Sequence, residues 1–522
     1  MVTPCFTPQL TLTRCRHYRV SPLYLALLLL VGMGLQLPAA EDDWLVPLGL
    51  PPRAAPRHIS GGEGVPPLPL PATPLRRTER KRVPSPPTFI GKVVWGESGE
   101  YRYADGQTAQ VADWNLCPDD LAQLMRKAGR WFGIPYGSQP VSLSSFNPDP
   151  AETPALFFSG VRTLRLTADQ LNLLRSYIAQ GGMAIFDSIA GSPYFHHSAR
   201  AVAQQLIPNE PIRTVPLDHP IFHMMTDATT VAFPRNNIGD KPLMEAIYLG
   251  SRIACLISPY GLGCGWDDHE VPILEQATFY DADSANRLGI NIVAYGIGYA
   301  AAARLEAKPE TFGLIDEATP TDELVFAQIR HPGAWNVHPG AATALLRRLR
   351  RESPLRVSLK REAVTPGQDD LSPYVMLYLE GLDTFTWDEP ALTALRQFIA
   401  RGGTLIVNNG LGLSTFDTSA RTSLNTLLPN TPLTPLDPQH PLFTTFRTVD
   451  TITASPALRQ RFPELTAPSL EGVVINGDLR IIYSRFDLAA AWLGCDYPLA
   501  LCYSGEDAIN LGMNILIYTM TH

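Results

Sequence analysis

The sequence repeats itself at a long period, and this repeat limits how the chain can fold. Trp114-Asn115 recurs as Trp335-Asn336, 221 residues further along the chain. The same offset relates three more pairs of motifs: Gly181-Gly182 and Gly402-Gly403, Ser198-Ala199-Arg200 and Ser419-Ala420-Arg421, and His219-Pro220 and His440-Pro441. So many matches without a gap predict two copies of one domain. We place the copies at residues 88–303 and 324–522, with a linker at 304–323.

Within each copy, short apolar runs alternate with helical patterns, which is typical of strand-helix-strand units around a buried parallel sheet. Residues 155–159 and 374–379 are continuous apolar runs of strand length. Thr167-Ala168-Asp169-Gln170 and Thr386-Trp387-Asp388-Glu389 each fit a capping box that opens a helix. Each copy is therefore predicted to be an α/β domain. The expected architecture is a doubly wound, mostly parallel sheet with helices on both faces.

The first 87 residues differ from the repeats. Basic residues precede an apolar run at 23–37, and no acidic residue occurs before Glu41. The run is shorter than the roughly 20 residues that span a bilayer, so residues 1–40 indicate a signal sequence and an exported, periplasmic or extracellular protein. An uncleaved segment that holds the protein at the membrane is the alternative. Residues 41–87 are rich in proline and include a basic patch at 76–82, which favours an extended linker.

The net charge and the number of cysteines limit the classes of partner and of fold that this chain can have. The net charge is −8, from 50 acidic and 42 basic residues, so a nucleic acid is not an expected partner. Beyond residue 40 the chain has five cysteines, an odd number that does not suggest a disulfide framework. Cys495 and Cys502 are close enough in sequence to form a local disulfide in an oxidising compartment. The alternative is that both are small buried side chains.

The repeated motifs resemble the bacterial domain-of-unknown-function family 4159, present twice. The resemblance rests on the Trp-Asn pair, the His-Pro-Ile/Leu-Phe segment, the run Ser-Pro-Tyr-Gly-Leu-Gly-Cys-Gly-Trp at 258–266, and the closing Leu-Gly-x-Asn-Ile helix. The second copy departs from it at 484–492, where alanines replace the glycines. The resemblance implies a class I glutamine-amidotransferase-like, flavodoxin-like fold. It implies no reaction, because one fold hosts many functions.

The turn after the strand at 183–186 is the first place to look for catalysis, because ligands of open α/β sheets bind at the carboxyl ends of the strands. A glutaminase of this fold would need a cysteine there. The turn reads Asp187-Ser188-Ile189-Ala190-Gly191, and no cysteine stands there in either copy. Amidotransferase chemistry is therefore excluded. Ser188 could act as a nucleophile with His219 as base and Asp187 or Asp218 as orienting carboxylate. The alternative is that these polar residues cap helices and turns.

The glycine-rich loop at 261–266 is the second candidate site. Gly261, Gly263 and Gly265 could bring backbone N–H groups to an anion, and Trp266 with Asp267 could contact a carbohydrate. The polar run Trp266-Asp267-Asp268-His269-Glu270 could hold a hard cation through its carboxylates. The alternative is a tight turn ahead of a packing tryptophan, followed by a solvated acidic loop, and we predict neither a metal nor a cofactor.

These observations favour a binding or scaffolding protein of the cell envelope without catalysis. The landmarks shared by the copies are turn, cap and core residues, whereas most ionisable candidates differ. We expect a protein partner or self-association through the repeat surfaces. The alternatives are a serine-type hydrolase confined to the first copy and carbohydrate or anion binding at the 261–266 loop.

Overall fold

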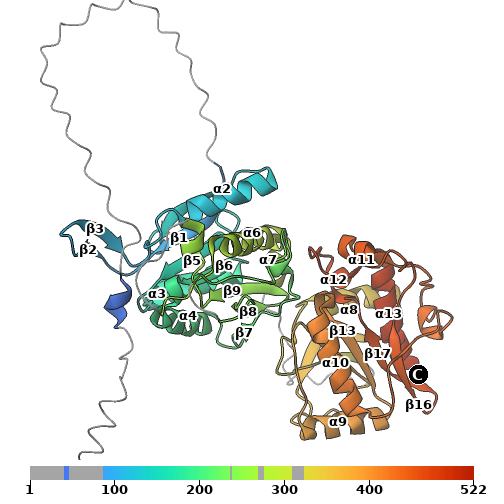
Figure 1. The fold of residues 1–522 in the computed structure, drawn as a ribbon. Helices are drawn as coiled ribbons and strands as arrows, with labels where there is room; N and C mark the ends of the chain where they lie inside the picture. Colours follow the sequence, from blue (N-terminus) through green and yellow to red (C-terminus); the bar gives the residue numbers. More distant parts are fainter. Residues whose placement is uncertain (1–39, 46–85, 235–237, 268–275, 308–322) are drawn as a thin grey trace, which may run out of the picture.

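The computed structural model describes residues 40–45, 86–234, 238–267, 276–307 and 323–522. They form two α/β units in tandem, one from each half of the chain (Figure 1). Among the described residues each unit has a seven-stranded, mostly parallel sheet with helices packed on it, so the predicted fold is confirmed. The predicted signal sequence and most of the two linkers lie outside the described residues.

The first sheet has the order β4-β1-β5-β6-β9-β8-β7. Its strands are β1 (Thr88–Val94), β4 (Gly137–Ser142), β5 (Ala155–Gly160), β6 (Met183–Ser188), β7 (Arg213–Thr214), β8 (Glu245–Leu249) and β9 (Arg252–Ser258). The central strands are parallel, and β8 and β7 extend the sheet antiparallel. The helices are α2 (Asp120–Phe132), α3 (Ala168–Ala179), α4 (Pro193–Leu206), α5 (Gly263–Asp267), α6 (Ala282–Gly298) and α7 (Ala300–Glu306).

The second sheet repeats this order as β11-β10-β12-β13-β17-β16-β14. Its strands are β10 (Leu324–Ile329), β11 (Val357–Val364), β12 (Met376–Gly381), β13 (Thr404–Asn409), β14 (Thr434–Pro435), β16 (Glu471–Ile475) and β17 (Asp478–Ser484). Its helices are α8 (Ala341–Glu352), α9 (Glu389–Ala400), α10 (Ser414–Leu427), α11 (Pro456–Arg461), α12 (Ala489–Leu493) and α13 (Gly505–Thr521). The first unit adds a hairpin, β2 (Ser98–Arg102) with β3 (Thr108–Ala112). The second adds the short pair β15 (Thr453–Ala454) and β18 (Tyr503–Ser504).

The corresponding helices α3 and α9 begin with different capping residues. Thr167 caps α3 and forms the predicted capping box with Gln170. The capping box predicted at Thr386 is wrong, because Asp388 caps α9 by accepting a hydrogen bond from Ala391 N. Pro390 explains the difference, since proline suits the first helical turn, where an N–H group has no partner within the helix.

Each sheet lies between two helical layers. In the first unit α2, α5 and α6 pack on one face, and α3 and α4 pack on the other. In the second unit the corresponding layers are α8, α12 and α13, and α9 and α10. Within the described part of the chain no single helix is long and apolar enough to cross a membrane. Only α6 and α7 taken together, bent by 55°, meet that test.

The predicted linker begins with a docked segment. The short helix η1 (Glu41–Trp44) lies against the first repeat, where Trp44 is buried beside Val111 and Leu116. Glu41 accepts a hydrogen bond from Thr163 N, and Asp42 pairs with Arg162 at 2.9 Å. The expectation of an extended linker is therefore wrong for residues 41–45, because Trp44 packs against the hydrophobic surface of the first repeat.

The two repeats are joined by buried and hydrogen-bonded contacts. The largest apolar cluster of the first repeat continues into the second through Val337, Leu411 and Tyr497. Asp218 of the first repeat binds the start of α10 in the second, accepting from Ser414 Oγ, Thr415 N and Thr415 Oγ1, each at 2.7 Å. A carboxylate at this place satisfies free N–H groups and opposes the positive end of the helix dipole. The copies therefore form one packed pair.

Replacing Asp218 with alanine is expected to lower the free energy of unfolding by about 1 kcal/mol, because α10 loses its cap. Urea denaturation followed by circular dichroism measures the change. Asp437→Ala is the matched control, since this exposed carboxylate in the corresponding turn of the second repeat accepts a hydrogen bond from its neighbour Gln439 N and, among the described residues, makes no contact with the first repeat. An equal loss in both variants would contradict a specific role for the contact between the repeats.

Candidate functional site

Both sheets end in a sharp turn at the edge where ligands of this fold class bind. In the first repeat the turn follows β6, and Ala190 has the left-handed φ of 56°. In the second it follows β13, and Leu411 has a φ of 54°. Enzymes with a comparable strand-turn-helix often place their nucleophile in such a strained conformation. Here both strained residues are buried and aliphatic, so neither can attack a substrate.

Asp187, at the end of β6, fixes the glycine-rich loop. Its two carboxylate oxygens accept hydrogen bonds from Leu262 N and Gly263 N, both at 2.8 Å. Burial raises the pKa of Asp187 to about 7, although these two N–H groups counteract the shift. The second repeat does the same with a neutral side chain, because Asn408 Oδ1 accepts from Leu488 N at 2.9 Å. This strand-end residue thus has a structural task in both copies.

A buried ion pair lies beside Asp187. Lys92, within β1, donates to both oxygens of Asp120 at 2.8 Å, and also to Asn115 Oδ1 and the Cys117 carbonyl. Lys92 is 6% exposed and Asp120 is fully buried. Burial raises the pKa of Asp120 to about 6, against the opposing effect of Lys92. The pair therefore joins β1 to the start of α2.

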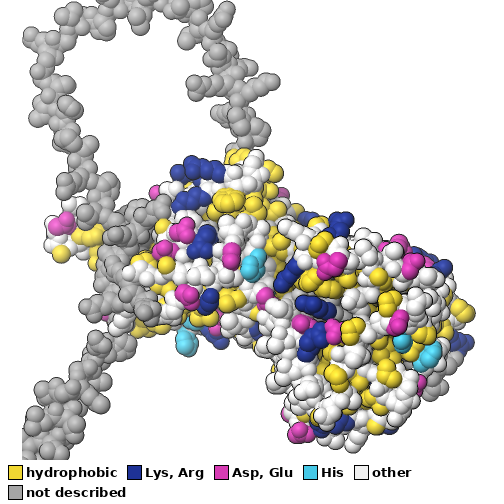
Figure 2. Space-filling view, turned by 45° about the vertical axis from the view of Figure 1, so that its right-hand side comes forward, with side chains coloured by type: hydrophobic (Ala, Val, Ile, Leu, Met, Phe, Trp, Pro, Cys, Tyr) yellow, Lys and Arg dark blue, Asp and Glu magenta, His cyan; other side chains and the backbone are white. Residues whose placement is uncertain are grey.

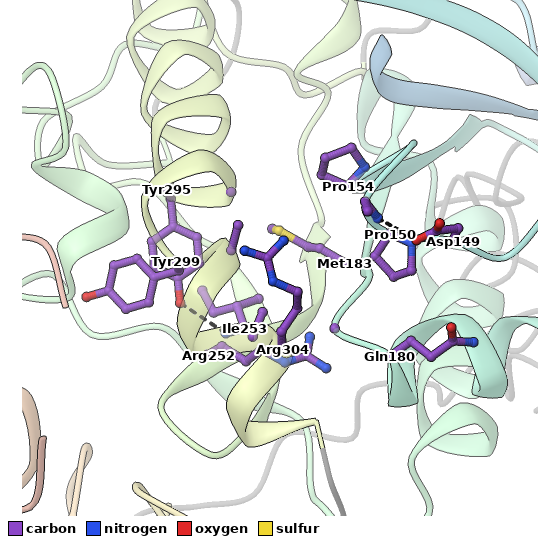
Figure 3. Close-up of a pocket in the computed structure, with 15 residues that line it drawn as sticks. Asp149, Pro150, Pro154, Gln180, Met183, Arg252, Ile253, Tyr295, Tyr299 and Arg304 are labelled. Carbon is purple, nitrogen blue, oxygen red and sulfur yellow. Dashed lines mark hydrogen bonds between the residues drawn. The ribbon is translucent and has the colours of Figure 1, made fainter. Parts of the chain in front are cut away.

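The structure does not bring Ser188 and His219 together. Ser188 Oγ is buried and has no hydrogen-bond partner within the described residues. His219 packs between the rings of Tyr248 and Tyr295. The Tyr295 hydroxyl accepts from Ile253 N near the start of β9, the opposite end of the sheet (Figure 3). Five residues of strand separate the two ends, which corresponds to about 16 Å.

His219 has a structural role where it lies. Its Nδ1 accepts from Ile221 N at 3.2 Å, and His440 Nδ1 accepts in the same way from Leu442 N. Burial lowers the pKa of His219 to about 3, so the ring is neutral. A small cavity of about 100 Å³ also lies at this end of the sheet, lined by Arg252, Tyr295 and Arg304 (Figure 3). It is remote from the candidate groups at the carboxyl edge.

The N–H groups at the start of the glycine-rich loop are bound to the protein itself. The N–H groups of Leu262 and Gly263 bind Asp187, and Gly261 N donates to the Thr278 carbonyl. Gly265 is tightly packed, since a Cβ there would lie 2.4 Å from Ala285 Cβ. Trp266 is 1% exposed and donates to the Ala285 carbonyl, and Asp267 is buried as well. The loop thus binds the protein's own carboxylate, and Asp268 to Glu270 lie outside the described residues.

The second repeat contains a cluster that the sequence analysis did not identify. His338 Nε2 lies 2.6 Å from Asp487 Oδ2, and His338 Nδ1 lies 3.1 Å from the Tyr497 hydroxyl. That hydroxyl donates to Glu306 at 2.6 Å, so Nδ1 must itself donate. Both ring nitrogens then carry a proton, and His338 is an imidazolium. Burial opposes this charge, but the carboxylates of Asp487 and Glu306 outweigh burial and raise the pKa of His338 well above its usual value.

Glu380 completes the cluster at the end of β12. Its oxygens accept from the Tyr378 hydroxyl at 3.2 Å, from Asn408 Nδ2 at 3.1 Å and from His338 N at 3.4 Å. Burial raises the pKa of Glu380 to about 7, and the nearby charge of His338 counteracts this only in part. The pKa of Asp487 is lowered, because His338 outweighs the effect of burial. Within the pair, the proton is therefore held by His338 rather than by Asp487.

His338, Glu380 and Asp487 are residue types that bind metal ions, and their donor atoms lie within 4.8 Å of one another. Their bonding does not fit a metal site. Asp487 already accepts from Leu411 N, Ala489 N and Asn408 Nδ2 in addition to His338. An imidazolium has no lone pair for a cation. The cluster is thus a closed ionic network.

A cavity of about 340 Å³ reaches the cluster from outside, with Cys495, Tyr497 and Cys502 in its lining. Neither cysteine is an activated nucleophile. Cys502 Sγ lies 4.0 Å from Asp487 Oδ2, and burial together with that carboxylate raises the pKa of Cys502 well above its usual value. Cys495 Sγ lies 3.7 Å from the Asp496 carbonyl oxygen, and burial raises the pKa of Cys495 too. Both thiols are free in this structure, and each sulfur lies against an oxygen atom, Cys502 Sγ against Asp487 and Cys495 Sγ against the Asp496 carbonyl.

The buried imidazolium predicts an unusual pH dependence. Because the folded pKa of His338 is above the unfolded value of about 6.5, its stabilising contribution is complete below that pH and is lost as the pH rises toward the folded pKa. We expect the difference in unfolding free energy between the wild type and His338→Gln to be largest near pH 6 and to shrink by up to about 1.4 kcal/mol per pH unit above pH 7. Urea titrations from pH 6 to 9 measure it. A difference that grows with pH would contradict a charged His338.

The buried ionisable residues of the two networks are only weakly marked in the sequence. Lys92 and Glu380 are single charges within apolar strand runs, which is unusual for strands buried on both faces. His338 and Asp487 are separated by 149 residues and have no motif in common. Glu306 belongs to the first repeat but contacts the second through Tyr497. Only the charged residues inside strands could have been found from the sequence.

Comparison with known proteins identifies the domain type. A family model described as a domain of unknown function, DUF4159, matches residues 102–297 and 325–520. No curated protein matches the chain. One similar solved structure is a "putative phosphosugar isomerase" from Silicibacter pomeroyi DSS-3. It is 12% identical, and the match covers 62% of this chain and 75% of that one with a TM-score of 0.13. A TM-score of 0.13 gives no information about function.

Proposed function

The chain belongs to the DUF4159 family as two tandem copies, and we propose that it is an exported binding or scaffolding module of the cell envelope rather than an enzyme. One observation carries the proposal: at the carboxyl edge of both sheets the buried carboxylates are bonded to buried cations or to loop N–H groups, and Ser188 Oγ, which has no partner among the described residues, lies away from His219. Asp187 and Asp487 are the central acceptors of these two networks. Catalysis would require at least one of these groups to be free for a substrate.

The surface and the interface between the repeats support a binding role. Charges of both signs are interspersed over the face seen in Figure 2, so this face has no uniformly basic area for a polyanion. The repeats are joined by a buried contact between Glu306 and Tyr497 and by the hydrogen bonds of Asp218, which suits a module that presents one fixed surface to a protein partner or to a second copy. The sequence of residues 1–40 supports export, with an uncleaved membrane tether as the variant.

Two measurements test this proposal. The purified chain and its Ser188→Ala variant are incubated with generic ester, amide and phosphate-ester substrates. We expect equal, background-level hydrolysis, and hydrolysis that is lost with the Ser188 hydroxyl would overturn the non-catalytic assignment. Cell fractionation tests export: the full chain should be recovered from the periplasm or the envelope, whereas a chain without residues 1–40 should stay in the cytoplasm. Cytoplasmic recovery of both forms would refute export.

A further inference from the structure

Two cysteines far apart in sequence meet at the carboxyl edge of the first sheet. Cys117 Sγ and Cys264 Sγ lie 3.6 Å apart, although 147 residues separate them. Both side chains are buried, at 0% and 1% exposure, beside Ile189 and Ala190. Free thiols in such contact can form a bond of about 2.05 Å with a small side-chain rotation. We propose that Cys117 and Cys264 form a structural disulfide when the chain reaches an oxidising compartment.

The backbone on both sides of this pair is already fixed. The Cys117 carbonyl accepts from Lys92 Nζ at 2.6 Å, three residues before α2 begins. Gly263 N, next to Cys264, donates to Asp187. A disulfide here would therefore join two segments whose separation the fold maintains. It would tie the start of α2 to α5 and close a long loop of the unfolded chain, which is the situation in which a disulfide stabilises most.

The second repeat supports this inference, because it connects the corresponding segments in another way. Residue 338 stands where Cys117 stands, at the repeat offset of 221, and it is a histidine. His338 binds Asp487, two residues before α12, which is the counterpart of α5. In both copies a contact thus joins the segment before the first long helix to the region of the short helix after the central strands. The second copy uses an ion pair from the loop before α12, and the first has two thiols, one of them within α5.

The other described cysteines do not make such a pair. Cys255 lies in β9, inside the apolar layer with α3 and α4. Cys502 contacts Asp487, and Cys495 contacts the Asp496 carbonyl. Among the described residues, the contact at 3.6 Å is therefore the only one between two sulfur atoms.

The chemistry is thiol–disulfide exchange. The two S–H bonds break and one S–S bond forms, and the two electrons and two protons pass to the disulfide of an oxidant, which becomes two thiols. The oxidant is a thiol–disulfide oxidoreductase of the envelope or the oxidised form of a small-molecule thiol. Because the thiols are buried, the exchange takes place during folding, before α2 and α5 close over them. The proposal rests on export only for its cellular setting.

Refolding tests the pair without any need for export. The full chain is unfolded, reduced and refolded in a buffer of oxidised and reduced glutathione, then alkylated and cleaved under non-reducing conditions. We expect one cross-linked species that joins the peptides of Cys117 and Cys264, with Cys255, Cys495 and Cys502 alkylated. Free Cys117 and Cys264 in the refolded protein, or a Cys495–Cys502 cross-link in their place, would overturn the proposal. Failed export in the fractionation experiment would leave this result unchanged.

Thermal unfolding supplies a second readout. Reduction of the oxidised wild type is expected to lower Tm by roughly 5–15 °C, because the unfolded chain gains conformational freedom. The double variant Cys117→Ala/Cys264→Ala should show no such response, and Cys495→Ala, the control, should respond as the wild type does. If the double variant does not fold, the peptide map and the response of Cys495→Ala decide the matter. A wild type whose Tm is insensitive to reductant would contradict a structural disulfide.

Discussion

Replacing Asp487 with alanine is expected to lower the free energy of unfolding of the second repeat by about 4 kcal/mol. The carboxylate is fully buried and is the counterion of His338, 2.6 Å away. Its removal leaves a buried imidazolium without its nearest anion. It also leaves Leu411 N and Ala489 N without acceptors, and each such group costs free energy of its own. Urea denaturation monitored by tryptophan fluorescence measures the loss.

The control lies in the same loop. Asp496 is exposed and lines the outer cavity, so Asp496→Ala should unfold as the wild type does. A second variant separates charge from shape: Asp487→Asn keeps an acceptor for Leu411 N but loses the charge that holds the proton on His338. It should recover part of the stability and lower the pKa of His338, which NMR titration can follow. An Asp487→Ala protein as stable as the Asp496→Ala control would show that the network does not stabilise the fold.

The fold could be predicted from the sequence because its signals are local or repeated. Strands buried on both faces, such as β5 and β12, appear as continuous apolar runs. Because the domain occurs twice, each such signal can be checked against its counterpart in the other copy. The cap at Thr167 follows from four neighbouring residues. The cap at Asp388 was misassigned, because two side chains could start α9 and only the position of Pro390 decides between them.

The candidate site could be predicted only in part, since its groups converge from distant segments. The ends of the predicted strands indicate the edge of the sheet at which Asp187 lies. They do not show that Asp187 binds Gly263 N instead of orienting a histidine. His219 was linked to Ser188 by residue type alone, and the sheet separates them. Among the described residues, the fully buried histidine that meets a carboxylate is His338, in the second repeat.

The two networks stabilise the same edge with different charges. In the first repeat Lys92 supplies the cation, and in the second repeat His338 does. The position equivalent to Asp187 is neutral in the second copy, as Asn408, and there the carboxylates come from Glu380 and Asp487. A buried polar network is stable only when every member is satisfied, so a charge cannot change alone. This explains why the ionisable residues differ between the copies while the turns after β6 and β13 agree.

A double-mutant cycle on Lys92 and Asp120 tests whether one buried charge of a network can be changed without the other. Lys92→Met is expected to destabilise the first repeat by about 3–5 kcal/mol at pH 8, because a buried carboxylate loses its cation and the Cys117 carbonyl loses a donor. The loss should be smaller at pH 5. Without Lys92 the folded pKa of Asp120 rises above the value of about 6, and a group with a raised folded pKa loses stability as the pH increases.

The second substitution decides whether charge is the cause. In the wild type, Asp120→Asn should destabilise, since Lys92 then becomes the unpaired buried charge. In the Lys92→Met background the same change should stabilise at pH 8, because it removes the uncompensated carboxylate and supplies an amide that can donate to the Cys117 carbonyl. Lys241→Met, at an exposed lysine near Asp240, is the control and should leave unfolding unchanged. Two substitutions whose effects simply add would show that packing, and not the ion pair, holds β1 against α2.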